Sequence, residues 1–144
     1  VAYSADGTKL AAGLGYPEPS VVVFNTQTNE QICSLRGHTD LVKSVCFSPC
    51  GEKIASGGGD VNGNRDYSIR IWDAKTGEQI GSPLKAHSNV VRAVAWSLFG
   101  QWLASGGDDR MIFIYDANAF EVKSSLRGHR YAPSLSKECF LSLG

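Results

Sequence analysis

The sequence predicts an all-β protein made of about three similar antiparallel units with four strands each. Two observations carry this prediction. The 144 residues are 42% apolar and include 16 glycines, a composition typical of many short strands joined by tight turns. The same succession of turn, strand and closing motif also occurs three times along the chain, and such repetition is the signature of repeat architectures.

Four segments recur in the same order in each unit. A Ser-x-x-Gly turn occupies residues 4–7, 48–51 and 97–100. A strand of apolar and small residues follows, at 10–13, 54–57 and 103–106, and then a strongly apolar strand, at 21–25, 69–73 and 112–116. Each unit closes with a leucine, a basic residue, a small residue and a histidine, at 35–38, 84–87 and 126–129.

The histidines support this alignment, because all three in the chain fall at the closing position of their units: His38, His87 and His129. The first interval between them is the longer one, mainly because of a polar stretch at residues 58–67. Chance would rarely place every histidine of a chain in one register.

Gly37-His38 followed by Trp72-Asp73, with a period of about 40–45 residues, resembles the WD-repeat β-propeller family. The third unit has Tyr115-Asp116 in place of Trp-Asp, and the first, with Phe24-Asn25, is degenerate. The resemblance implies stacked four-stranded blades. Stacking also suits the strand at 111–115, which is apolar on both faces and must be covered on both.

This resemblance implies a partial propeller over residues 1–129, with blades at about 1–37, 38–86 and 87–128, followed by a divergent C-terminal tail at 130–144. Propellers close with about 4–8 blades. Three blades cannot close a ring, so we expect a fragment of a larger one. The alternative is a complete chain that closes a ring by assembling with copies of itself.

The resemblance also implies a hydrogen-bonded tetrad within each well-matched blade. The expected members are His38, Ser56, Asp66 and Trp72 in the second unit and His87, Ser105, Asp109 and Tyr115 in the third. In such a tetrad the carboxylate fixes one imidazole nitrogen, the other nitrogen accepts the serine proton, and the serine accepts the aromatic donor. Tyr115 lacks an indole, so we expect a looser third tetrad. The first unit has Ala12 in the serine position and Glu18 near the aspartate position, so we expect no tetrad there.

Aspartate, histidine and serine are also the parts of a hydrolase triad. Two features argue against catalysis. The same set recurs in adjacent units, and Ser56 lies in a plain Ala-Ser-Gly strand rather than in a Gly-x-Ser-x-Gly elbow. We therefore interpret the tetrads as structural, expect the chain not to be an enzyme, and expect no cofactor.

Residues 60–66 place oxygen-bearing side chains at alternate positions, as a calcium loop does. The bidentate glutamate is missing, since Ile71 stands in its place, and Arg65 stands where the loop requires glycine. Cys46 and Cys50 have no partners at zinc-binding spacing. We expect no metal site, with a calcium-binding loop as the alternative.

In this family the loops that enter the first strand and those between the second and third strands open on one face. We expect partners to dock there. The candidate residues are Leu41, Lys43, Arg65, Tyr67, Val90, Arg92 and Asp108. The long loop at 58–65 and the Pro-Glu-Pro loop at 17–19, its counterpart in the first unit, make this face distinctive. Long loops on a rigid scaffold often carry function.

These observations predict a non-catalytic scaffold that docks partner proteins or peptides within a multiprotein complex. Fourteen basic residues balance fourteen acidic ones, which argues against a nucleic-acid surface. A phosphopeptide or nucleic-acid reader is the remaining alternative, and we expect no small-molecule ligand. No apolar run reaches membrane-spanning length. The scattered cysteines favour an intracellular setting, cytoplasmic or nuclear.

Overall fold

The computed structural model describes residues 1–18, 20–60 and 63–127, and within them the chain is all-β, as predicted. The strands are β1 (Ala2–Tyr3), β2 (Lys9–Gly13), β3 (Ser20–Asn25), β4 (Gln31–Arg36), β5 (Val42–Phe47), β6 (Lys53–Gly58), β7 (Ile69–Asp73), β8 (Val91–Trp96), β9 (Trp102–Gly107), β10 (Met111–Asp116) and β11 (Val122–Arg127). The predicted C-terminal tail at 130–144 lies outside the described residues, as does His129. The described part of the chain contains no helix of the length and apolarity that crossing a membrane requires.

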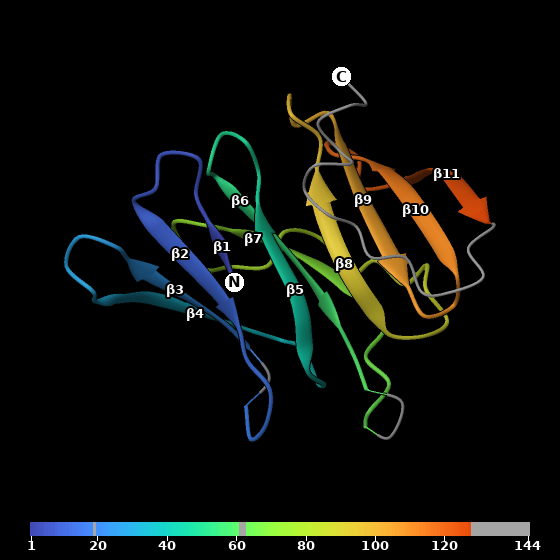
Figure 1. Ribbon diagram of the computed structural model, residues 1–144, viewed down its shortest axis with the longest axis horizontal. Helices are drawn as coiled ribbons and strands as arrows, with labels where there is room; N and C mark the ends of the chain where they lie inside the picture. Colours follow the sequence, from blue (N-terminus) through green and yellow to red (C-terminus); the bar gives the residue numbers. More distant parts are fainter. Residues whose placement is uncertain (19, 61–62, 128–144) are drawn as a thin grey trace.

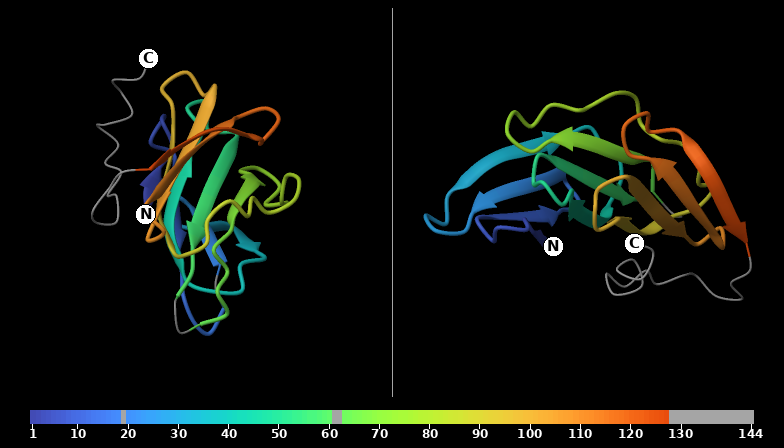
Figure 2. Two further views of the ribbon diagram at one scale, coloured as in Figure 1. Left: turned by 90° about the vertical axis from the view of Figure 1, so that its right-hand side faces the viewer. Right: turned by 90° about the horizontal axis from the view of Figure 1, so that it is seen from above.

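The strands form three antiparallel sheets, which correspond to successive blades. Their orders are β1-β2-β3-β4, β5-β6-β7 and β8-β9-β10-β11. Within each sheet the strands pair in sequence order, so each blade is a meander (Figure 1). Seen from above, the blades lie side by side in an arc (Figure 2). Their first strands face the neighbouring blade, since β5 contacts both β1 and β8.

The Ser-x-x-Gly turns form the connections between the first and second strands of the blades. In the second blade the Gly51 N–H donates to the Ser48 carbonyl at 2.9 Å, and the Ser48 hydroxyl accepts the Lys53 N–H at 3.0 Å. Gly51 has a φ of 72°, in the left-handed region that glycine adopts without a steric penalty. The motif therefore closes the hairpin through both its serine and its glycine.

The second blade has three strands rather than the four that were predicted. In place of a fourth strand the chain makes two isolated bridges to β7, Ile69 with Leu84 and Trp72 with Gln79. Gly81, with a φ of 68°, turns the backbone away between these bridges. Pro83 has no N–H to donate to the ladder. The fourth segment is consequently attached at its two ends only.

The core lies between the blades. One apolar cluster joins the first and second blades and includes Val23, Leu35 and Trp72. A second cluster joins the second and third blades and includes Ile71 and Tyr115. Both faces of the middle blade are therefore buried, which is the arrangement that stacked apolar strands require. In β10 only Tyr115 is fully buried.

Candidate functional site

In the second blade the four tetrad residues come together beneath the loops. His38 precedes β5, Ser56 lies on β6, Asp66 precedes β7, and Trp72 lies on β7. His38 Nδ1 is 3.0 Å from Asp66 Oδ2, and His38 Nε2 is 2.8 Å from Ser56 Oγ. The Trp72 indole N–H donates to the same Ser56 oxygen at 2.8 Å. Because the carboxylate can only accept, Nδ1 carries the proton and Nε2 accepts the serine hydroxyl.

The tetrad connects two loops as well as two strands, β6 and β7. Asp66 also accepts the Thr39 N–H at 2.9 Å and the Ser68 hydroxyl. Burial by itself would raise the pKa of Asp66, but hydrogen bonds from His38, Ser68 and Thr39 outweigh it and hold the pKa well below its ordinary value. The carboxylate is therefore ionised and holds the loop before β5 against the loop before β7.

The third blade repeats this arrangement. His87 Nδ1 lies 2.8 Å from Asp109 Oδ2, and His87 Nε2 lies 2.8 Å from Ser105 Oγ. The Tyr115 hydroxyl reaches Ser105 at 3.3 Å, which is longer than the corresponding tryptophan bond. Burial lowers the pKa of His87, against the opposing effect of Asp109, and burial raises the pKa of Tyr115 to about 12. Both groups are thus neutral at ordinary pH.

The first blade has no equivalent network among its described residues. Ala12 stands in the serine position, and the exposed Glu18 forms a 2.9 Å ion pair with Arg36. Both partners of this pair are well exposed, so the pair contributes little to stability.

The predicted docking residues lie at the ends of the strands where the tetrad histidines and aspartates are found. Lys43, Arg65 and Arg92 are exposed, and Leu41, Tyr67 and Asp108 are half-buried. The loops after β2 and after β6 hang from the lower edge of the sheets in Figure 1. We refer to this edge, formed by residues 14–18, 38–43, 59–60, 63–68, 88–92 and 107–110, as the rim.

One rim prediction is wrong: Val90 is only 2% exposed and cannot contact a partner. The Asp108 N–H donates to the Val90 carbonyl at 2.9 Å, and Gly107 packs closely against the same carbonyl. The segment before β8 is therefore hydrogen-bonded to the end of β9, and the Val90 side chain lies inside.

Arg92 and Asp108 contact each other rather than standing as separate anchors. Arg92 Nε lies 2.9 Å from both Asp108 carboxylate oxygens, and Nη2 donates to Oδ2. This hydrogen bonding raises the pKa of Arg92 further above its ordinary value. A partner that uses either side chain must therefore compete with this pair.

Sequence reasoning missed Asp40, which is completely buried within the rim. Its carboxylate accepts the backbone N–H groups of Leu41, Asp60 and Arg65 and the hydroxyl of Tyr16. The available signal was its place two residues after the tetrad histidine, where the third blade has Asn89. A single aspartate in a loop has no periodicity that would distinguish it from a solvated residue.

Asp40 also changes the interpretation of the calcium-like stretch. In a calcium loop the oxygens point inward toward the cation. Here two backbone N–H groups point inward toward a carboxylate, and the Asn64 amide donates outward to the Thr39 carbonyl at 2.7 Å. The described part of this loop is therefore folded around an anion. In the ranges that the structure describes, no three His, Cys, Asp or Glu side chains gather as metal ligands.

The family model for the WD domain, G-beta repeat, matches residues 29–73 and 77–116. The chain belongs to the WD-repeat family. Each matched repeat begins just before the last segment of one blade and ends with the third strand of the next, at β7 and β10. The sequence repeat of this WD-repeat chain is therefore offset from its blades, so that one repeat spans two neighbouring blades.

Individual WD-repeat proteins are similar to parts of this chain. The APC/C activator protein CDC20 of Saccharomyces cerevisiae is 32% identical over 57% of the chain, and WD repeat-containing protein 41 of Mus musculus is 38% identical over 42%. THO complex subunit 3 of Arabidopsis thaliana is 31% identical over 54% of the chain. The matched segments span only 13%, 13% and 24% of these three proteins.

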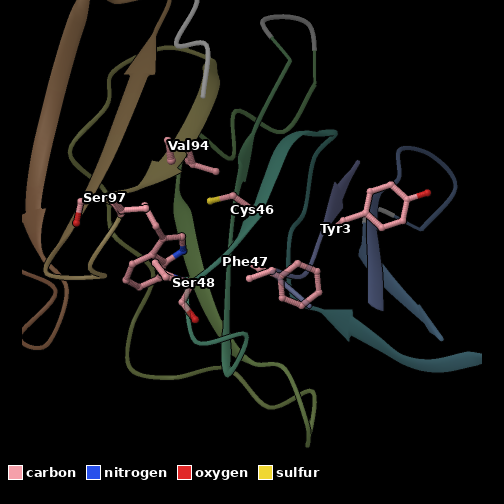
Figure 3. A pocket seen from close by; sticks show the side chains of 11 residues that line it. Tyr3, Cys46, Phe47, Ser48, Val94 and Ser97 are labelled. Atoms are coloured by element: carbon pink, nitrogen blue, oxygen red, sulfur yellow. The ribbon is translucent and has the colours of Figure 1, made fainter. Parts of the chain in front are cut away.

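At the opposite end of the strands lies a cavity of about 310 Å³ that the sequence did not indicate. It is lined by the first strands of the blades and their turns, including Tyr3, Phe47 and Trp96 (Figure 3). Among the described residues, the buried Trp96 indole N–H has no hydrogen-bond partner.

Proposed function

We propose that this WD-repeat chain belongs to a non-catalytic docking platform, which binds partner proteins or peptides through the rim. The observation that carries the proposal is the rim itself. Exposed Lys43 lies there at the start of β5, and exposed Arg65 and half-buried Tyr67 lie on the loop before β7. Arginine and tyrosine are common anchor residues in protein interfaces.

Preorganisation of the rim supports this proposal. The second tetrad fastens the loop before β5 to the loop before β7 through Asp66, and the third fastens the matching loops through Asp109. A surface whose loops are already ordered loses less conformational entropy when a partner binds. Such a surface is better suited to recognition than a mobile one.

The accessibility of the serines argues against catalysis. Ser56 and Ser105 are both 0% exposed, and each hydroxyl is already engaged by a histidine and an aromatic donor. A nucleophile needs a site beside it where a substrate carbonyl can lie. The tetrad serines instead have packed side chains around them, so we assign them a structural role.

The names of the relatives favour protein partners. One is named as an activator protein of the APC/C and another as a subunit of the THO complex. Because the chain matches only a small part of each, neither complex is assigned to this chain. The likeness supports the general class of partner: other proteins within an assembly.

The proposal is tested by charge reversal on the rim of the full-length protein. Partners that co-purify from cells are compared for the wild type, Lys43→Glu with Arg65→Glu, and Lys75→Glu. Lys75 is an exposed control in the turn after β7, away from the rim. We expect the double rim variant to lose at least one partner that the control retains. Retention of every partner by the rim variant would contradict the proposal.

A further inference from the structure

We propose that Asp40 is the positioning residue of the rim: its carboxylate joins the loop after β2 and the loop after β6 into one ordered ledge that presents Arg65 and Tyr67. The use of this ledge by a partner rests on the proposed function. The ordering of the two loops by Asp40 does not, and it can be measured without any partner.

The hydrogen bonds show how one carboxylate joins two blades. Oδ2 accepts the N–H groups of Asp60 at 2.9 Å and Arg65 at 3.1 Å, which lie at the two ends of the long loop of the second blade. Oδ1 accepts the Leu41 N–H at 2.8 Å and the hydroxyl of Tyr16, from the first blade, at 3.3 Å. Each oxygen therefore accepts two donors from the described part of the chain.

Because Asp40 is buried, its carboxylate requires these hydrogen bonds. Asp40 is 0% exposed, and a buried carboxylate is strongly unfavourable unless hydrogen bonds replace its hydration. Among the described residues, none of the groups that donate to Asp40 is a charged side chain. The loop backbone thus supplies what water would otherwise supply, so Asp40 and the loop become ordered together.

The loop backbone is shaped to fit the carboxylate. A Cβ atom added to Gly63 would lie 2.6 Å from Asp40 Oδ2, so only glycine allows this approach. Arg65 has a φ of 58°, a left-handed conformation that a non-glycine residue rarely adopts. In this conformation the Arg65 N–H points toward Asp40. The same turn therefore sets the position of the Arg65 side chain.

The first blade contributes a close contact of its own. The Val42 N–H donates to the Leu14 carbonyl at 3.1 Å, and Leu41 packs so closely on Gly15 that an added Cβ would lie 2.4 Å from Leu41 Cδ2. Tyr16, which follows, is 59% exposed although its hydroxyl reaches Asp40. Its ring is therefore held at the surface next to the second blade.

The third blade offers a natural comparison. Asn89 occupies the matching position, and its side-chain oxygen accepts only the neighbouring Val90 N–H, at 2.8 Å, among the described contacts. The loop there is short and closes on itself through the Arg110 N–H and the Gly107 carbonyl at 3.1 Å. Asp40 therefore has the cross-loop role that Asn89 lacks.

The test is hydrogen exchange of the full-length protein, read at the amides of residues 60 and 65. Asp40→Asn keeps the side-chain shape but replaces one acceptor oxygen with an NH2 group that faces N–H donors. We expect exchange at these two amides to be about tenfold faster or more, while amides in β5 to β7 exchange as in the wild type. Asn89→Ala is the matched control and should leave residues 60 and 65 unchanged.

A second variant keeps the proposal falsifiable if changing Asp40 unfolds the blade. Gly63→Ala retains the carboxylate but obstructs the approach of the loop, and it should also accelerate exchange at residues 60 and 65. Wild-type exchange at both amides in folded Asp40→Asn, or in Gly63→Ala if Asp40→Asn does not fold, would overturn the proposal.

The exchange result separates this inference from the docking function. If the ledge becomes mobile in Asp40→Asn but rim charge reversal leaves every partner bound, the docking function fails and the positioning role of Asp40 stands. If the ledge stays ordered, the positioning role fails, whatever the partners do.

Discussion

Replacing Ser56 by alanine tests whether the tetrad is a structural device. Within the described residues, Ser56 Oγ is the partner of the Trp72 indole N–H, and it also donates to His38 Nε2. Alanine therefore leaves one buried donor and one buried acceptor unpaired, both at side chains that are almost fully buried.

The magnitude follows from the number of unpaired atoms. Each buried polar atom left without a partner costs about 1–3 kcal/mol, so Ser56→Ala should lower the free energy of unfolding by about 2–6 kcal/mol. Ser105→Ala should cost less. This variant leaves His87 Nε2 unpaired. The other hydrogen bond of Ser105, to the Tyr115 hydroxyl, is already long at 3.3 Å and contributes less than about 1 kcal/mol.

The assay is urea unfolding of the protein that contains this chain, followed by tryptophan fluorescence, with stability taken from the midpoint and slope. Ser82→Ala is the control, since Ser82 is exposed and its effect should stay within about 0.5 kcal/mol. The structural reasoning is refuted if Ser56→Ala unfolds at the wild-type urea concentration. Lost hydrolytic activity with unchanged stability would instead support a catalytic serine.

Three further predictions concern pH, the rim ion pair and calcium. The folded state lowers the pKa of His87 from 6.5 and that of Asp66 from 3.8. The stability linked to both groups is therefore present at neutral pH and lost on acidification, first below about pH 6.5. Urea midpoints measured from pH 8 to pH 4 should fall, and the part of the fall nearest pH 6.5 should be smaller in His87→Gln. Arg92→Ala breaks a pair whose arginine is 48% exposed, so the loss of stability should stay below about 1 kcal/mol and be smaller still in high salt; a loss of several kcal/mol would show that the pair is buried in solution. Added calcium should leave the melting temperature unchanged, because the described loop amides face Asp40 rather than a cation; a rise that Asp60→Ala abolishes would contradict this.

The sequence predicted most where a residue belonged to a repeating pattern. Ser56 and Trp72 could be placed in one site because the resemblance to the WD-repeat family implies the tetrad, and the corresponding residues recur in the next unit as Ser105 and Tyr115. The stacked apolar strands were predictable for the same reason. A repeat pattern shows what the units have in common, so features shared by the blades could be predicted from a single sequence.

The departures are local, and each has a physical cause that a repeat pattern does not carry. The missing fourth strand of the second blade follows from Gly81 and Pro83, which interrupt the ladder. Val90 aligns with Leu41, but Val90 is buried, whereas Leu41 is half-buried and packs on Gly15 of the first blade. Asp40 acts on an insertion present in one blade only, so no second copy existed to reveal it.

Two buried carboxylates, Asp66 and Asp40, divide the stabilisation of the rim between them. Asp66 holds the base of the loops to the strands through His38, while Asp40 holds the outer part of the long loop and the neighbouring Tyr16. The family tetrad alone would leave the insertion without support beyond its end at Asp66. A loop lengthened within a repeat therefore requires a second internal anchor if its side chains are to be presented in one arrangement. A carboxylate that accepts backbone N–H groups can provide this anchor, because backbone N–H groups are present whichever side chains the loop carries.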